Sequence, residues 1–179
     1  MTATTRQERL HRLDALERAR AAAAAVLDPE VPVLTIEELG VLRDVSLGDD
    51  GAVVVTVTPT YSGCPAMEVI EADVEQAVRN AGFSDVQVRR VLSPAWTTDA
   101  MTDAGRAKLR DYGIAPPARI GGPPGPGGDR GPVLVALSVR CPRCGSSDTS
   151  ELSRFGSTAC KALWRCNACR EPFDHFKAI

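Results

Sequence analysis

Residues 141–169 run from Cys141-Pro142-Arg143-Cys144 to Cys166-Asn167-Ala168-Cys169, and this stretch carries the strongest structural signal in the chain. Twenty-one residues separate Cys144 from Cys166. A Cys-x-x-Cys turn points two thiolates at one position, so two such turns can complete a tetrahedral cage of four sulfurs. The gap lies just beyond the usual ~15–20 residues of a zinc ribbon. We therefore expect all four cysteines to bind a structural zinc ion.

Other uses of these four cysteines stay open. Iron could occupy the same cage, because the pattern Cys-Pro-x-Cys-Gly of residues 141–145 also suits rubredoxin-like sites. A thioredoxin-type redox pair is disfavoured, since neither pair lies in a strand–helix–strand pattern. Four inert buried thiols are the simplest alternative, and the repeated pairing argues against them.

The charge of the chain gives little reason to expect nucleic acid as a partner. The chain has 179 residues and a formal net charge of −2. Residues 132–179 carry seven Lys/Arg and four Asp/Glu, so their formal charge is +3 and that of residues 1–131 is −5. Zinc in a cage of four thiolates would add about −2. A nearly neutral tail weakens the case for a nucleic-acid-binding ribbon.

No apolar run is long enough to span a bilayer, and the first residues lack the apolar core of a signal peptide. Six cysteines, four of them in two pairs, are typical of metal and thiol chemistry rather than of a disulfide framework. We therefore expect no membrane partner and a location in the reducing cytoplasm.

Apolar periodicity and turn residues predict the secondary structure of the first 118 residues. Asp28-Pro29 should end the first helix, because the residue before proline avoids helical angles. Gly48-Asp49-Asp50-Gly51 should turn a hairpin, and Gly82 should end the second helix. The expected elements are a helix at about 5–27, strands at 41–47 and 53–58, a helix at about 65–81, a strand at 86–92 and a short helix at about 103–112.

A Gly/Pro-rich segment divides the chain. Residues 121–131 contain six glycines and three prolines and cannot build a packed core. The fold class is thus α+β, with a small helix and three-strand domain at 1–118, a linker at 119–131 and a zinc-ribbon-like domain at 132–179. The last domain is short and should depend on its metal for stability.

Cys64 is the candidate working thiol. The segment Tyr61-Ser62-Gly63-Cys64-Pro65 ends a strand and opens a helix. The free amides and the positive dipole end of a helix lower the pKa of a cysteine placed there. Such a thiolate could be a nucleophile or could hold a transient iron ion or cluster, although a small buried capping residue is the simpler alternative. Neither His11 nor His175 is placed as its base, which disfavours hydrolytic or acyl-transfer catalysis by this thiol.

Three other features are weaker. Asp28-Pro29-Glu30 could hold acids near Cys64, or it could be only a helix stop. Trp96-Thr97-Thr98-Asp99 could line a groove for a partner, or it could start the next helix with Thr98 or Thr102 as its cap. Cys160 has no partner in a four-ligand cage, and we expect it to be packed in the interior.

Five motifs stand out, at residues 28–32, 59–65, 93–99, 155–161 and 171–174. Together they resemble the phenylacetate-degradation protein D family, and the resemblance covers about residues 20–118 and 132–179. The first two motifs are shared with the wider SufT-like family of iron–sulfur assembly domains. The Trp-Thr-Thr-Asp segment and the appended cysteine pairs narrow the resemblance to the D protein.

The resemblance implies a function. Members of the family are encoded with the multicomponent oxygenase that epoxidises the ring of phenylacetyl-CoA, which has a di-iron subunit and an iron–sulfur reductase. A SufT-like domain suits an accessory protein that matures or repairs these centres, without catalysis of its own. In that role Cys64 would be the working thiol, with Asp28 and Glu30 near it. The four paired cysteines match the metal-binding tail of the family.

Two positions depart from the family pattern. Ala100 stands where a tryptophan is expected, and Ala178 stands in a region where many relatives have a cysteine. Three other functions remain open: a stable structural or electron-transferring subunit of the oxygenase, a free-standing thiol enzyme and a nucleic-acid ribbon.

Overall fold

A computed structural model describes residues 5–118 and 139–178 of the chain. The chain divides into two compact units, Met1–Trp96 and Thr97–Ile179. The expected linker at 119–131 lies outside the described residues, so the domain limits drawn from it stay a prediction. Among the helices of the described residues, none combines the length and the apolar character needed to cross a membrane.

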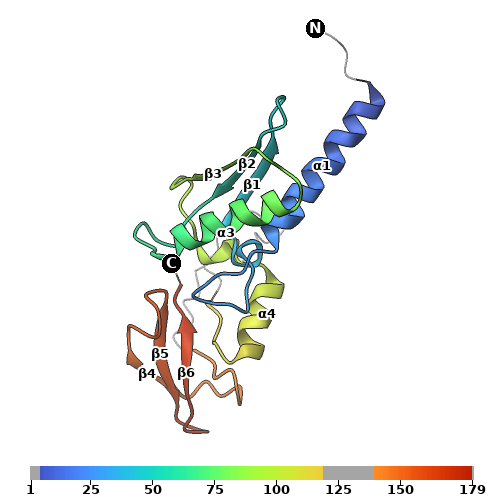
Figure 1. Cartoon of the computed structure of the whole chain (residues 1–179). Coiled ribbons are helices and arrows are strands. Elements are labelled where there is room, and N and C mark those ends of the chain that lie inside the picture. The colour runs from blue at the N-terminus through green and yellow to red at the C-terminus, as the bar shows by residue number, and fades with distance from the viewer. Residues whose placement is uncertain (1–4, 119–138, 179) are drawn as a thin grey trace, which may run out of the picture. The chain divides into compact units, whose positions relative to one another are not determined.

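A three-stranded sheet forms the first unit, in the order β1-β2-β3 (Figure 1). β1 (Leu42–Leu47) and β2 (Val53–Val57) form the predicted antiparallel hairpin. β3 (Val86–Arg90) runs parallel to β2, with Val57 opposite Arg90. A parallel pair needs a crossover, and α3 (Ala66–Asn80) supplies it.

Two helices pack on this sheet, and they also contact each other (Figure 1). α1 (Arg6–Ala24) begins with a capping box in which the Thr5 side chain bonds the backbone of Glu8. The core includes the inward residues of β2, which are fully buried, and the apolar stripe of α3. These residues are Val53, Val55 and Val57 on the strand and Met67, Ile70, Val74 and Val78 on the helix.

The segment after α1 differs from the prediction. The helix ends at Ala24 rather than near residue 27, because Leu27 and Asp28 pair with the chain at Leu34 and Thr35. A four-residue helix, α2 (Ile36–Leu39), follows and ends at Gly40, which has a φ of 78°. The buried Trp96 donates its indole N–H to the carbonyl of Leu39 at 3.0 Å. Trp96 is therefore a core residue, not the lining of a groove.

The second unit joins residues 97–118 to a second sheet of order β4-β5-β6. The short 3₁₀ helix η1 (Thr98–Ala100) precedes α4 (Asp103–Tyr112), whose N-cap is Thr102. The strands β4 (Thr149–Ser153), β5 (Lys161–Cys166) and β6 (Pro172–Phe176) are antiparallel.

Ala115 extends this second sheet. Its N–H donates to the carbonyl of Asp174 at 2.8 Å, and its carbonyl accepts from the N–H of Phe176 at 2.9 Å. Ala115 therefore lies beside β6 as a parallel neighbour. It also belongs to the buried cluster of the ribbon, together with Cys141, Cys166 and Phe173.

The histidine of β6 makes the stability of this unit depend on pH. The ring of His175 packs edge-on against Trp164, with centroids 5.8 Å apart, and burial lowers its pKa to about 4. Its ordinary pKa is about 6.5, so the unfolded chain binds more protons than the folded chain between pH 6.5 and 4, and acid over this range favours unfolding. We expect a loss of about 2 kcal/mol, discounted from about 3 because the side chain is only partly buried.

Urea unfolding of the metal-loaded chain at pH 6.5 and pH 5 tests this dependence. His175→Gln should flatten the pH profile, and His11→Gln, at an exposed position of α1, should not. Acid also weakens thiolate–metal bonds, but that effect is common to all three proteins. Equal slopes for His175→Gln and His11→Gln would show that His175 does not cause the dependence.

Candidate functional site

The four paired cysteines come together in the second unit. The Sγ atoms of Cys141, Cys144, Cys166 and Cys169 all lie within 4.8 Å of one another. Two of the separations are 3.8 Å, from Cys141 to Cys169, and 3.5 Å, from Cys144 to Cys166. Four sulfurs about 2.3 Å from a central zinc ion would be separated by similar distances, so this donor set fits a tetrahedral metal. The site can bind a metal ion.

Without a metal, hydrogen bonds within the site shift the pKa values of its thiols in opposite directions. A hydrogen bond from the backbone of Cys169 is the largest of the effects that lower the pKa of Cys166, to about 7. A backbone hydrogen bond from Glu171 lowers the pKa of Cys169, but burial and the bonds with neighbouring thiols outweigh it and raise that pKa to about 12. A metal ion must therefore displace protons from the cage, so the metal affinity of the site should decrease as the pH is lowered.

The residue that follows each cysteine pair has a left-handed backbone. Gly145 follows Cys144 with a φ of 73°, and Arg170 follows Cys169 with a φ of 68°. Arg170 is the one non-glycine residue with a positive φ in the described part of the chain. Glycine adopts this conformation without the steric penalty that a Cβ atom brings. The second turn therefore carries backbone strain that the first avoids.

Arg170→Gly should relieve this strain. We expect the metal-loaded protein to gain about 0.5–1 kcal/mol of unfolding free energy, measured by urea denaturation. Arg143→Gly is a matched control, because Arg143 lies in the first turn without a positive φ, and glycine there should not stabilise. Equal effects of the two substitutions would contradict the argument.

Cys160 lies outside the cage. It is 4% exposed, and its Sγ lies 3.0 Å from the hydroxyl of Thr158. Its backbone carbonyl accepts a hydrogen bond from Lys177. The fifth ribbon cysteine is thus packed in the interior, as predicted, and it provides a control for the four ligand positions.

Cys64 is half-buried at the start of α3. Its N–H donates to the carbonyl of Tyr61, and its carbonyl accepts from Met67 at 3.4 Å, so the loop turns directly into the helix. α3 itself begins at Ala66, with Pro65 as N-cap. The thiol therefore lies beside the first amides of the helix, where the sequence analysis places it.

The predicted direction of the Cys64 pKa is wrong. Burial, the largest effect, raises the pKa of this thiol above its ordinary value, and the charges of Glu30 and Asp28 raise it further. Hydrogen bonds from the backbone of Ala66 and the side chain of Thr60 lower it, but they do not compensate. The helix terminus acts as expected, yet desolvation and two carboxylates outweigh it.

The loop at Asp28 brings both acids within electrostatic range of the thiol. Asp28 is 6% exposed, and its Oδ1 accepts hydrogen bonds of 2.8 Å from the N–H groups of both Glu30 and Val31. Asp28 therefore closes its own loop and acts on Cys64 as a charge. The sequence motif alone could be read as a helix stop, and the structure adds this electrostatic contact.

Arg90 also interacts electrostatically with Cys64, and two glutamates of α3 act on Arg90; none of these three residues was predicted from the sequence. Arg90 donates from Nε to Oε1 of Glu71 at 2.6 Å. Its pKa is raised first by this bond and also by the charges of Glu68 and Cys64. The spacing of Glu68 and Glu71 on one helix face was a usable signal, but the position of Arg90 depends on the parallel pairing of β3.

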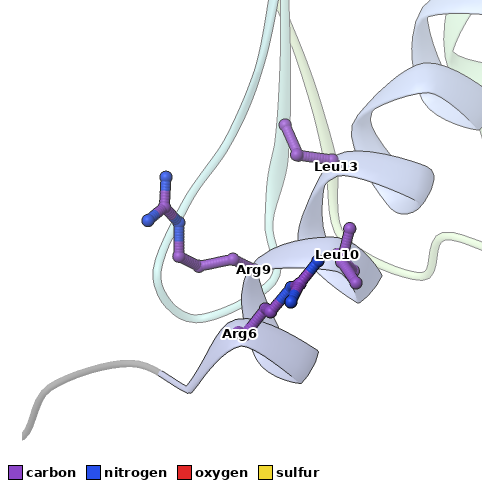
Figure 2. A pocket seen from close by; sticks show the side chains of 4 residues that line it. All are labelled: Arg6, Arg9, Leu10 and Leu13. Carbon is purple, nitrogen blue, oxygen red and sulfur yellow. The ribbon is translucent and has the colours of Figure 1, made fainter.

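A hollow of about 470 Å³ lies apart from these residues in the chain, near the start of α1 (Figure 2). It is lined by Arg6, Arg9, Leu10 and Leu13, all from one helix, and no candidate site residue lines it. Both leucines are more than half exposed. This hollow has no thiol or acid in its lining and is not part of the candidate site.

Comparison with known proteins identifies the two parts of the chain. Residues 129–177 match the family model of the PaaD zinc beta ribbon domain, and residues 16–89 match that of the iron-sulfur cluster assembly protein. Over 85 residues the chain is 36% identical to the Fe-S protein maturation auxiliary factor YitW of Bacillus subtilis (strain 168), covering 47% of this chain and 82% of that protein.

A solved structure supports the fold of the first part. The crystal structure of a domain of unknown function, DUF59, from Bacillus anthracis superposes with a TM-score of 0.52 at 26% identity. The match covers 56% of this chain and 96% of that one. It agrees with the α+β fold expected from the sequence.

One relative extends over most of the chain. Over 152 residues the chain is 51% identical to a protein of Escherichia coli (strain K12) that is named as a component of 1,2-phenylacetyl-CoA epoxidase, covering 85% of this chain and 86% of that protein. A match of this length extends into both the assembly domain and the ribbon. The chain therefore belongs to the phenylacetate-degradation protein D family, with an iron–sulfur cluster assembly domain followed by a PaaD zinc β-ribbon.

Proposed function

We propose that this protein is an accessory factor that helps to assemble or repair the iron or iron–sulfur centres of a phenylacetyl-CoA epoxidase. One observation carries the proposal: a half-buried thiol, Cys64, lies at a helix start among charged side chains, within the part of the chain that matches the iron-sulfur cluster assembly family. The similarity to the epoxidase component of Escherichia coli supports the choice of client.

In this role Cys64 is the thiol that temporarily binds the iron ion or iron–sulfur cluster being transferred. A thiolate is a good ligand for iron, but the raised pKa means that the thiol is mostly protonated near neutral pH. Binding a metal would displace that proton, because a cation close to the sulfur stabilises the thiolate. A single thiol whose proton competes with the metal binds that metal weakly, which suits temporary rather than permanent attachment.

The ribbon has a separate, structural role in this proposal. Zinc bound by the four paired cysteines would hold the second unit together, and that unit would contact the oxygenase subunits. Zinc has no accessible redox couple and favours four sulfur ligands, so it suits a structural site. Metal analysis of the purified protein, with a visible absorption spectrum, distinguishes zinc from iron in this cage.

A Cys64→Ala variant tests the proposed function. In cells that make the epoxidase with this variant, we expect epoxidase iron content and activity to fall at least tenfold, as they should when the protein is deleted. Cys160→Ala is the matched control, because Cys160 is buried in the ribbon and should not be needed. Normal iron loading and activity with Cys64→Ala would rule out the assembly role.

A stable subunit of the oxygenase is the second candidate, and the name of the Escherichia coli relative favours it. Such a subunit would co-purify with the oxygenase at fixed stoichiometry. An electron-transferring subunit would also need a redox-active metal in the four-cysteine cage, so a cage that contains only zinc excludes that version.

A further inference from the structure

The topology of the first unit places Arg90 and Cys64 at one edge of the sheet. β2 and β3 are parallel, so both strands end at the same edge, and Arg90 lies opposite Val57 at that edge. The chain leaves β2 at Val57 and reaches Cys64 seven residues later, just before α3 returns along the sheet. Ligands of parallel sheets bind at such an edge, outside the carboxyl ends of the strands.

Strand alternation determines which face Arg90 occupies. Val86, Val88 and Arg90 share one face of β3, and this face contacts α3, because Arg90 bonds Glu71 on that helix. Arg89 lies on the opposite face and donates to Gln87 at 3.4 Å. Two adjacent arginines thus differ in surroundings, and only Arg90 is held near the start of α3.

The ion pair fixes Arg90 without using all of its donors. Its Nε–H bonds Glu71 at 2.6 Å, and among the described residues its two Nη groups have no hydrogen-bond partner. Arginine carries five N–H donors, so the outer edge of the guanidinium can still bind an anion. Glu71 is 28% exposed and Arg90 40%, so the pair is accessible to solvent.

The charges near Cys64 and Arg90 come from three segments. Asp28 and Glu30, in the loop after α1, act on Cys64. Glu68 and Glu71 on α3 act on Arg90, which ends β3 and also interacts with Cys64. Arg90 is already paired with Glu71, so this one guanidinium does not also balance the charges of the other carboxylates. The surroundings therefore contain acidic groups that attract a cation and one guanidinium that attracts an anion.

We propose that Arg90 is a recognition residue of the Cys64 site, which receives the anionic sulfur part of an iron–sulfur species while the carboxylates of Asp28 and Glu30 favour its iron. The inference rests on the proposed function and names the class of cargo: iron that carries sulfide or thiolate ligands, rather than the bare ion. A bare cation would be repelled by Arg90, and a purely anionic ligand would be repelled by the carboxylates of Asp28 and Glu30.

Two alkylating reagents measure the charge that Arg90 contributes. Iodoacetate is an anion and iodoacetamide is neutral, and with both the Cys64 thiolate displaces iodide and forms a sulfur–carbon bond. The ratio of their rates at one pH is independent of the thiolate fraction, so it reports the local electrostatic potential. The metal-loaded full chain is used, and mass spectrometry of the Cys64 peptide separates this thiol from the other five.

Arg90→Met should lower the iodoacetate-to-iodoacetamide rate ratio about two- to fivefold at low ionic strength, and the difference should shrink in 0.5 M salt. Arg90→Lys should retain most of the ratio, since it keeps the charge. Arg89→Met is the matched control and should leave the ratio unchanged. Arg90→Gln provides a second neutral variant if the methionine variant does not fold.

Equal ratios for Arg90→Met, or Arg90→Gln, and Arg89→Met would overturn the inference. That result would leave the assembly role of Cys64 standing. Conversely, a normal iron content of the epoxidase in cells with Cys64→Ala would rule out the proposed assembly function. The alkylation ratios of the Arg90 variants would be unaffected by that result. In cells, epoxidase iron content should also fall with Arg90→Met and not with Arg89→Met, and equal iron contents would likewise count against the role of Arg90.

Discussion

Cys166→Ser should abolish metal binding by the ribbon and unfold residues 139–178. Cys166 is fully buried in the cluster formed with Ala115, Cys141 and Phe173, and its Sγ lies 3.5 Å from that of Cys144. Structural zinc contributes about 10–16 kcal/mol to the folding of small zinc domains. The apolar cluster of this unit is small, so loss of the metal should exceed what packing can offset.

Metal analysis and amide hydrogen exchange measure this loss. Metal content should fall from about one ion per chain to near zero, and the amides of β5 and β6 should lose their protection from exchange. A chelator should have the same effect on the unsubstituted protein. The amides of β2 should keep their protection, because β2 belongs to the other compact unit.

Cys160→Ala is the control for this experiment. It removes a buried ribbon cysteine that lies outside the cage, so it should keep the metal and the protection of β5. Full metal content in Cys166→Ser, or protected amides in the chelated protein, would mean that the ribbon folds without its metal.

Arg106→Met should destabilise the second unit by about 3–5 kcal/mol. Arg106 is 7% exposed, and it donates from Nη1 to the carbonyl of Pro117 at 2.6 Å and from Nη2 to the carbonyl of Thr98 at 2.5 Å. Each hydrogen bond to a charged group contributes about 1.5–3 kcal/mol. Methionine fills a similar volume but leaves both buried carbonyls without a donor, so the loss should be large.

Arg106→Lys should recover little of this stability. A single ammonium group cannot imitate the planar guanidinium, whose two Nη groups reach two different segments. Arg110→Met, at an exposed position of the same helix, should cost less than about 0.5 kcal/mol. Urea unfolding of the metal-loaded proteins measures all three. A loss below 1 kcal/mol for Arg106→Met would show that these carbonyls find other donors.

Local patterns predicted the parts of the fold that depend on nearby residues. The hairpin of β1 and β2 follows from β-branched runs around a Gly/Asp turn, and the four-cysteine cage follows from two four-residue Cys-x-x-Cys turns. Thr102 was one of two caps expected for α4, and it is the cap. Each of these predictions concerns residues within one element or one turn.

Long-range pairing explains what the sequence could not predict. The parallel register of β2 and β3 brings Arg90 to the edge where Cys64 lies, although the two residues are 26 positions apart. The bonds between residues 27–28 and 34–35 shorten α1 and bring Asp28 into range of the thiol. The prediction that the pKa of Cys64 is lowered failed for the same reason, since burial and remote charges are properties of the folded chain.

The pairing of Ala115 with β6 has a consequence for the solubility of fragments. A fragment that began at residue 132 would retain the four cysteines but lose Ala115, and the outer edge of β6 would then present unpaired N–H and C=O groups beside the apolar Phe173. Exposed strand edges of this kind pair with other molecules and promote aggregation. A fragment that began at Thr97 would keep its edge covered and should stay monodisperse at concentrations where the shorter one precipitates.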